Sequence, residues 1–138
     1  MNLMYQTLQT ANAILEIKSV EETSFDEAPS GPKLTKGRFV LSYRGDLEGE
    51  GILEELKVHF NAKNAVMQGL QRFKGKLGGR TGSFILKHIG RYVNGALSSK
   101  LALVPASATD GLKGLRGEMN LRNISPMQFT VTFNYHYA

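Results

Sequence analysis

The sequence predicts an all-β protein in which eight mainly antiparallel strands close into one barrel, and three observations support this. Apolar and polar residues alternate with a period of two along most of the chain, which is typical of half-buried strands. Turn sequences separate these segments at short intervals, and short connections favour antiparallel neighbours. Ten of the fifteen glycines gather near predicted strand ends, where bulges and bends help a sheet to coil.

The alternation also predicts which side chains of each strand face the interior. The final strand is the clearest, because five aromatic or branched residues oppose a threonine- and asparagine-containing face. The residues predicted to face inward are Phe39, Leu41 and Tyr43; Ile52, Glu54, Leu56, Val58 and Phe60; Met67, Gly69, Gln71 and Phe73; Phe84 and Leu86; Leu97, Leu101 and Leu103; Met119 and Leu121; and Phe129, Val131, Phe133, Tyr135 and Tyr137.

Turns and irregular segments are predicted from asparagine, glycine and proline. Four tight turns are expected, at residues 61–64, 77–80, 94–95 and 125–126. One longer irregular stretch is expected from Phe25 to Lys33. The chain is expected to form a single domain over residues 1–138, with a loose N-terminal segment over residues 1–10.

Three glycine-containing segments favour a closed barrel over an open sandwich. They cover residues 45–51, 75–82 and 111–117, and each combines a leucine with glycines near a strand end. Closure removes the exposed strand edges, which is the stronger solution for a small domain. None of the segments has the spacing of a phosphate-binding loop that opens a helix.

The composition excludes several classes of function. With no cysteine, the chain has no disulfide, thiolate nucleophile or cysteine-ligated zinc. No secretory signal pattern is evident, so a cytoplasmic location is expected. The net charge of +5 comes from dispersed lysines and arginines without interleaved exposed aromatics, so no nucleic-acid partner is predicted. No apolar run is long enough for a membrane helix, and no membrane partner is predicted.

Glu54 is the main candidate for catalysis or ligand binding. By alternation it lies on the apolar inner face of its strand, where lost hydration raises a carboxyl pKa and suits it to acid–base work. The alternative is that Glu54 pairs with an arginine across the strand or lies at a rim. Its neighbour Glu55 has the opposite parity and is expected to be solvated.

Four further residues are predicted to line the same interior as ligand-binding groups. Gln71 and His88 share faces with apolar residues, and Tyr43 and Tyr135 bring hydroxyl groups near strand ends. His59, His88 and His136 lie on separate strands without carboxylates at a ligand-like spacing, so no metal site is predicted. No cofactor is predicted either.

The glycine segments, together with Gly69-Leu-Gln-Arg72 and His88, resemble the bacterial domain of unknown function 3224 family. The resemblance covers most of the chain, from about Ile14 to Tyr135. It implies an eight-stranded barrel similar to allene oxide cyclase, of calycin-like shape, and a tendency to self-associate. The family usually has glutamate where this chain has Gln71, which weakens a catalytic carboxylate pair with Glu54.

Three functions remain open from the sequence. The first is a barrel that binds a small lipophilic or aromatic molecule through Glu54, Gln71 or His88. The second is an isomerase or cyclase with Glu54 as the acid–base group, so whether the protein is an enzyme stays uncertain. The third is a cavity-free module that forms homo-oligomers, with an outer contact stripe of Val40, Ile85, Ile89 and Val104.

Overall fold

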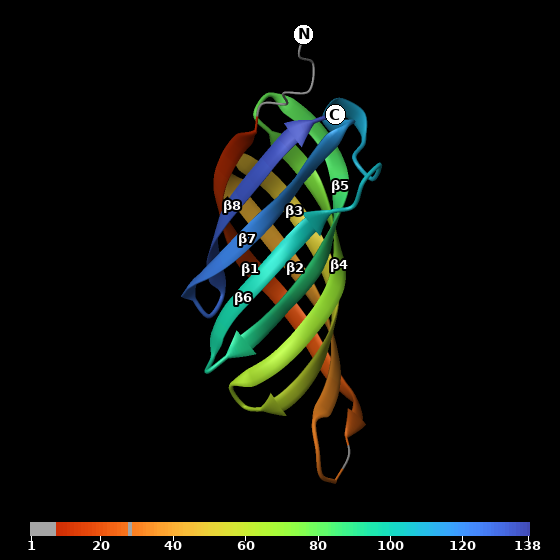
Figure 1. The fold of residues 1–138 in the computed structure, drawn as a ribbon, viewed down its shortest axis with the longest axis vertical. Helices are drawn as coiled ribbons and strands as arrows, with labels where there is room; N and C mark the ends of the chain where they lie inside the picture. Colours follow the sequence, from red (N-terminus) through yellow and green to blue (C-terminus); the bar gives the residue numbers. More distant parts are fainter. Residues whose placement is uncertain (1–7, 28) are drawn as a thin grey trace.

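The computed structural model describes residues 8–27 and 29–138, and in it the strands close into one barrel (Figure 1). The strand order in the sheet is the order in the chain, every pair is antiparallel, and β1 closes the barrel on β8. The predicted fold class is therefore confirmed. The elements are β1 (Gln9–Glu27), β2 (Lys33–Gly45), β3 (Leu47–Asn61), β4 (Asn64–Leu77), β5 (Arg80–Val93), β6 (Ala96–Leu103), a 3₁₀ turn η1 (Asp110–Leu112), β7 (Leu115–Ser125) and β8 (Gln128–Tyr137).

The four predicted tight turns all occur between strands that pair with each other. The irregular stretch is shorter than predicted, because β1 continues to Glu27 and β2 begins at Lys33. Of the predicted loose N-terminal segment, residues 1–7 lie outside the described residues, whereas Gln9 and Thr10 already belong to β1. No helix in the described part of the chain has the length and apolarity needed to cross a membrane.

Stacked aromatic rings fill the centre of the barrel. Phe84 is fully buried, and its ring centroid lies 4.9 Å from that of Phe73 and 6.0 Å from that of Phe133. The series continues with an edge-to-face contact from Phe73 to Tyr43 at 5.2 Å and a stacked one from Phe133 to Tyr135 at 5.2 Å. These rings come from β2, β4, β5 and β8, so the predicted inner faces of those strands meet in one core. Such aromatic pairs stabilise a core beyond the area that they bury.

The predicted inner face of β3 is wrong. Phe39 points inward and lies opposite Leu53 in the β2–β3 register, so the odd-numbered residues of β3 face the interior. Leu56 and Phe60 are consequently exposed, at 44% and 56%. Glu54 also lies on the outer face, opposite Arg38.

The two ends of the barrel differ. At the end where β2 meets β3 and β4 meets β5, apolar side chains from the turns and from η1 form a plug; we call this the closed end, and the plug consists of Leu47, Leu77, Leu112 and Leu115. After β6 the chain stays in the barrel wall and runs alongside β5. Ser107 Oγ accepts a hydrogen bond from the Ile85 amide at 3.0 Å, and the Thr109 amide donates to the Ser83 carbonyl at 2.9 Å.

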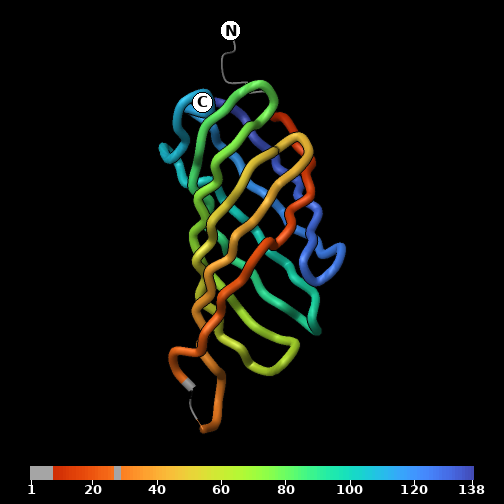
Figure 2. The backbone as a smooth tube through the Cα atoms, turned by 180° about the vertical axis from the view of Figure 1, so that it is seen from behind, coloured from red at the N-terminus to blue at the C-terminus, as the bar shows by residue number. Residues whose placement is uncertain are grey.

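The opposite end, which we call the open end, is staggered (Figures 1 and 2). The β1–β2 hairpin projects furthest, the β3–β4 and β5–β6 turns follow, and the β7–β8 turn lies highest on the barrel. The parts of β1 to β4 that extend beyond the β7–β8 turn therefore have no strand opposite them across the barrel. Polar side chains lead from the core to this end.

Candidate functional site

A chain of three buried polar side chains runs through the core towards the open end. The Tyr43 hydroxyl donates to Gln71 Oε1 at 2.6 Å, and Gln71 Nε2 donates to His88 Nε2 at 2.7 Å. All three residues are buried, which raises the pKa of Tyr43 and lowers that of His88 to about 4. His88 is therefore neutral at pH 7, and with Nε2 accepting, Nδ1 carries its proton.

Gly51 on β3 makes room for this chain. A Cβ atom at this position would overlap the side-chain amide of Gln71. Glycine matters there for space, since its φ is not in the left-handed region. The absence of a side chain thus leaves room for the amide, which its hydrogen bonds to Tyr43 and His88 hold in place.

A small cavity lies in the barrel interior on the open-end side of His88. Its volume is about 50 Å³, enough for a few ordered waters. Most of its wall is apolar, and the polar lining comes from β3, β5 and β6. The lining residues are Leu15, Ile17, Phe39, Leu41, Leu53, Glu55, Lys57, Met67, His88, Tyr92, Leu97, Ser99, Leu121 and Phe129.

Glu55 is the carboxylate of this cavity. It is only 7% exposed, and burial raises its pKa to about 7, although the charge of Lys57 opposes this shift. Its only ion pair among the described residues is a long one, with 3.7 Å from Oε1 to Lys57 Nζ. Glu55 consequently exchanges its proton near neutral pH, as the acid–base groups of active sites do.

Lys57 links the cavity to the rim of the barrel. Its ammonium nitrogen lies 5.2 Å from the ring centroid of Phe39 and 5.8 Å from that of Tyr92, within cation–π range. It is also 3.5 Å from Glu22 Oε1. One largely buried cation is thus shared between two carboxylates and two aromatic rings.

The rim itself is held by a second cluster at the base of the β1–β2 hairpin. Thr35 Oγ1 donates to Glu22 Oε2 at 2.7 Å and lies 2.8 Å from His59 Nε2, which is 3.3 Å from the same carboxylate oxygen. Burial works to raise the pKa of Glu22, but the Thr35 hydrogen bond and the Lys57 charge more than offset it and the pKa is lowered. Glu22 therefore stays ionised while Glu55 is near its titration point.

The structure separates the five residues predicted as ligand-binding groups. His88 lines the cavity, and Gln71 and Tyr43 stand behind it in the hydrogen-bonded chain. Tyr135 lies in a different place, because its hydroxyl donates to Gln9 near the start of β1. Glu54 is not in the interior at all: its side chain is 55% exposed and accepts a 2.7 Å hydrogen bond from Arg38. The pairing with an arginine across the strand, predicted as the alternative, is the correct one.

Sequence reasoning missed Glu55, Lys57 and Tyr92. The expectation that Glu55 is solvated is wrong, because the face of β3 with more apolar residues turns outward. A usable signal was present in Gly51 and Leu53, which share the parity of Glu55 and lie opposite the inward-facing Leu41 and Phe39. Among the described residues, no group of three or more histidine, aspartate and glutamate side chains is arranged to hold a metal ion.

The fold and site define a class: an antiparallel eight-stranded barrel with a packed closed end and a small polar cavity near its open end. Residues 11–135 match the family described as protein of unknown function (DUF3224), and the chain belongs to that family. A crystal structure of a DUF3224 protein of unknown function from Shewanella oneidensis MR-1 is similar, with 25% identity and a TM-score of 0.74. The match covers 97% of this chain and 99% of that one. No curated protein matches the chain, and the likeness to allene oxide cyclase stays a prediction.

Proposed function

We propose that this protein binds a small aromatic or otherwise lipophilic molecule at the open end of the barrel, with a polar group of the ligand in the cavity. The observation that carries this proposal is Glu55, a nearly buried carboxyl group whose one ion pair with the described residues is long. Burying such a group without full compensation is costly, and proteins keep such groups mainly where they act. A ligand hydroxyl or carbonyl would find Glu55 and the Nδ1–H of His88 as its partners.

The cavity volume limits what enters the barrel. About 50 Å³ accommodates a hydroxyl or carbonyl group and little more, so a long acyl chain does not fit inside. The body of the ligand then rests against the aromatic and apolar residues that line the cavity, among them Phe39, Tyr92 and Leu97. This mode of binding needs no opening of the aromatic core.

Acid–base catalysis on the same ligand is a second candidate function, with Glu55 in the role predicted for Glu54. The observation that favours it is the burial of Glu55 in the cavity that His88 also lines; this burial raises the pKa of Glu55 to about 7, so that one group takes and returns a proton near neutral pH. The two functions differ in one variant. Glu55→Gln should abolish turnover with little change in affinity if the protein is an enzyme, and should change only affinity if it is a binder.

Binding is tested with 4-fluorophenol as the probe, followed by ¹⁹F NMR of the ligand and by amide shifts of ¹⁵N-labelled protein. Saturable shifts are expected at Glu55, His88 and Tyr92. Glu55→Gln should weaken binding several-fold, and Ser99→Leu, which fills the cavity from β6, should abolish it. Native mass spectrometry of freshly purified protein should also reveal any ligand that co-purifies.

The matched control is Glu54→Gln, which removes the neighbouring carboxylate from the outer face. It should leave the affinity unchanged, and urea unfolding confirms that each variant is folded. The proposal is overturned if 4-fluorophenol at millimolar concentration leaves the cavity amides unshifted, or if the Glu54 and Glu55 variants have equal effects.

A further inference from the structure

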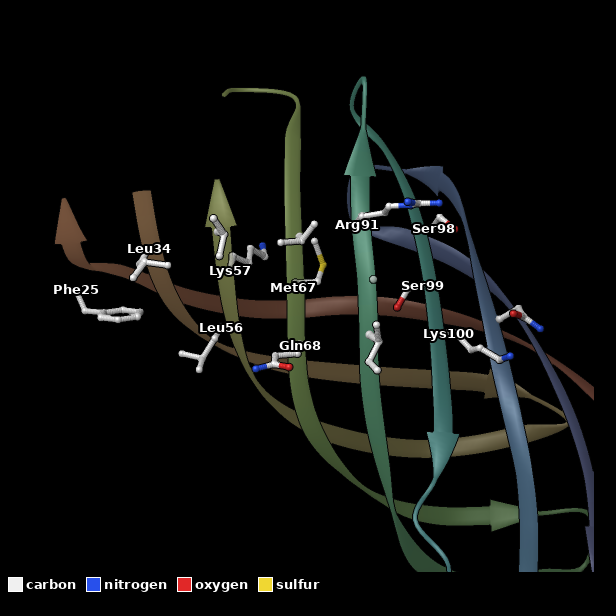
Figure 3. Close-up of a pocket in the computed structure, with 15 residues that line it drawn as sticks. Phe25, Leu34, Leu56, Lys57, Met67, Gln68, Arg91, Ser98, Ser99 and Lys100 are labelled. Carbon is white, nitrogen blue, oxygen red and sulfur yellow. The ribbon is translucent and has the colours of Figure 1, made fainter. Parts of the chain in front are cut away.

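A groove of about 910 Å³ crosses the outer face of the sheet (Figure 3). Two rows of outward-facing residues, each made of direct cross-strand neighbours, form its walls. One row is Leu34, Val58, Val66, Arg91 and Ser98, and the other is Leu56, Gln68, Ile89, Lys100 and Asn120.

The floor of the groove is backbone. Lys57, Met67 and Ser99 also line it, and each lies in sequence between one residue of the first row and one of the second. Their side chains point the other way, because all three line the interior cavity. The groove and the cavity are therefore on opposite faces of the same strands.

The groove has an apolar half and a cationic half. On β1 to β4 its outward-facing lining is apolar except for Gln68, with Phe25, Leu34 and Leu56 at one end, and the Lys57 side chain belongs to the interior cavity. On β5 to β7 it is mainly polar and basic, with Arg91, Ser98, Lys100 and Asn120 beside the apolar Ile89. Figure 3 shows the two groups at opposite ends. A surface that changes from apolar to cationic along one line matches a molecule that changes from apolar to anionic.

The cationic half has spare positive charge. No acidic side chain lines the groove, and Arg91 makes no ion pair with the described residues. Lys100 is 3.4 Å from Glu118, but both side chains are about half exposed or more, and such pairs hold little energy. An anionic group at this end would therefore interact with two positively charged side chains, those of Arg91 and Lys100.

The apolar side chains of the groove are unusually exposed for a sheet face. Ile89 is 56% exposed, Leu56 44% and Val66 42%. The distance from β2 to β7 covers five strand spacings, or about 24 Å, which is comparable with an extended long acyl chain. The interior cannot compete for such a chain, because its cavity is only about 50 Å³.

We propose that this groove binds a single-chain anionic amphiphile, such as a long-chain fatty acid anion. The tail lies along the apolar half over β2 to β4, and the anionic head lies between Arg91 and Lys100. A second copy of this chain fits less well, because the groove offers no acidic residue to meet the cations of its twin. A flat membrane surface would leave the floor of a groove unfilled.

The test maps the orientation of a bound probe by paramagnetic broadening. Stearate carrying a nitroxide at carbon 16 should broaden amides near Leu34, Leu56 and Val66. Stearate carrying it at carbon 5 should broaden amides near Arg91 and Ser98. Calorimetry with oleate below its micelle concentration gives the affinity, and the double variant Arg91→Gln with Lys100→Gln should weaken it about tenfold.

The matched control is Lys74→Gln with Lys87→Gln, which removes the same charge from the same outer face outside this groove. It should weaken oleate binding less than twofold. Glu55→Gln should leave oleate binding unchanged, so this proposal and the one for the cavity can fail separately.

Four results would overturn the proposal. They are absence of saturable oleate binding, broadening confined to interior residues such as Leu15 and Leu41, equal binding of dodecyltrimethylammonium, and equal effects of the two double variants. Light scattering without amphiphile gives a fifth such result. If the wild type has the mass of a dimer and Ile89→Glu has the mass of a monomer, a second copy of the chain covers the groove.

Discussion

Two adjacent carboxylates, Glu54 and Glu55, show how strongly one step along a strand changes the chemistry of a residue. Glu54 projects into solvent and pairs with Arg38, so it resembles any surface glutamate. Glu55 points into the barrel, where burial raises its pKa to about 7. The two residues have the same side chain, and only the face of the sheet distinguishes them.

The raised pKa of Glu55 predicts a specific pH dependence of stability. Folded protein binds this proton more tightly than unfolded protein, so the contribution of Glu55 to the free energy of unfolding falls as pH rises from about 4.5 to about 7. Glu55→Gln should therefore match the wild type below pH 4.5 and be more stable by roughly 2 kcal/mol at pH 8, with part of the gain offset by the lost partner of Lys57.

Urea unfolding at several pH values from 4 to 8.5 measures this difference. Glu54→Gln is the control, because it removes the neighbouring carboxylate from the solvent-exposed face of the same strand. A Glu55→Gln curve that runs parallel to the wild type between pH 5 and pH 8 would contradict the assignment of a raised pKa.

At this scale the sequence predicts alternation but not its direction. Both faces of β3 hold apolar residues, and the more apolar face suggested a core containing Ile52 and Leu56. Leu56 and Val58 of that face instead line a surface groove, and the inner face holds Glu55, Lys57 and His59 because it reaches the polar open end. Where both faces of a strand hold apolar and polar residues, only the register with a neighbouring strand decides which face points inward. For β3 that register places Leu53 opposite Phe39.

Among the elements, the β6–β7 contact is the weakest part of the barrel wall. The two strands pair from Ser99–Leu121 to Ala102–Glu118, and beyond Ser99 towards the open end they separate. A side chain replaces the missing ladder there, because Asn123 Oδ1 accepts a hydrogen bond from the Leu97 amide at 2.8 Å. Leu97, Ser99 and Leu121 all line the cavity, so this seam lies directly beside it.

Asn123→Ala should therefore loosen the wall locally. Removing one hydrogen bond of this kind costs about 1 kcal/mol, which corresponds to amide exchange at Leu97 that is roughly three to ten times faster. Native-state hydrogen exchange followed by NMR measures it. Amides near Leu86 and Leu103, far from the seam, should keep their protection.

Asn120→Ala is the matched control, since Asn120 lies on the same strand and its side chain makes no hydrogen bond with the described residues. It should leave the exchange rate of Leu97 unchanged. If both variants accelerate exchange equally, the Asn123 side chain does not hold the seam. Turn and strand positions were predictable here because asparagine and glycine mark them, but a side chain that substitutes for a ladder hydrogen bond follows no sequence pattern.

Across the whole molecule, packing divides the barrel into a solid half and a hollow half. The aromatic stack and the leucine plug fill the closed-end half, whereas the cavity and its titratable residues occupy the open-end half. The closed barrel was predictable because nearly every strand carries one apolar face. The division was not, because it depends on how side-chain volumes from eight strands add up at each level of the barrel.

Two buried phenylalanines, one in each half, test this division. Phe84 is enclosed by Phe73 and Phe133, so Phe84→Leu leaves a sealed void and removes two ring contacts. Phe129 is 3% exposed but lines the cavity, so a smaller side chain there only enlarges a space that already exists and has polar groups in its wall. Phe84→Leu should therefore lower the free energy of unfolding by about 1–2 kcal/mol more than Phe129→Leu does. Equilibrium urea unfolding of both variants measures the difference, and equal losses would mean that the two halves are packed alike.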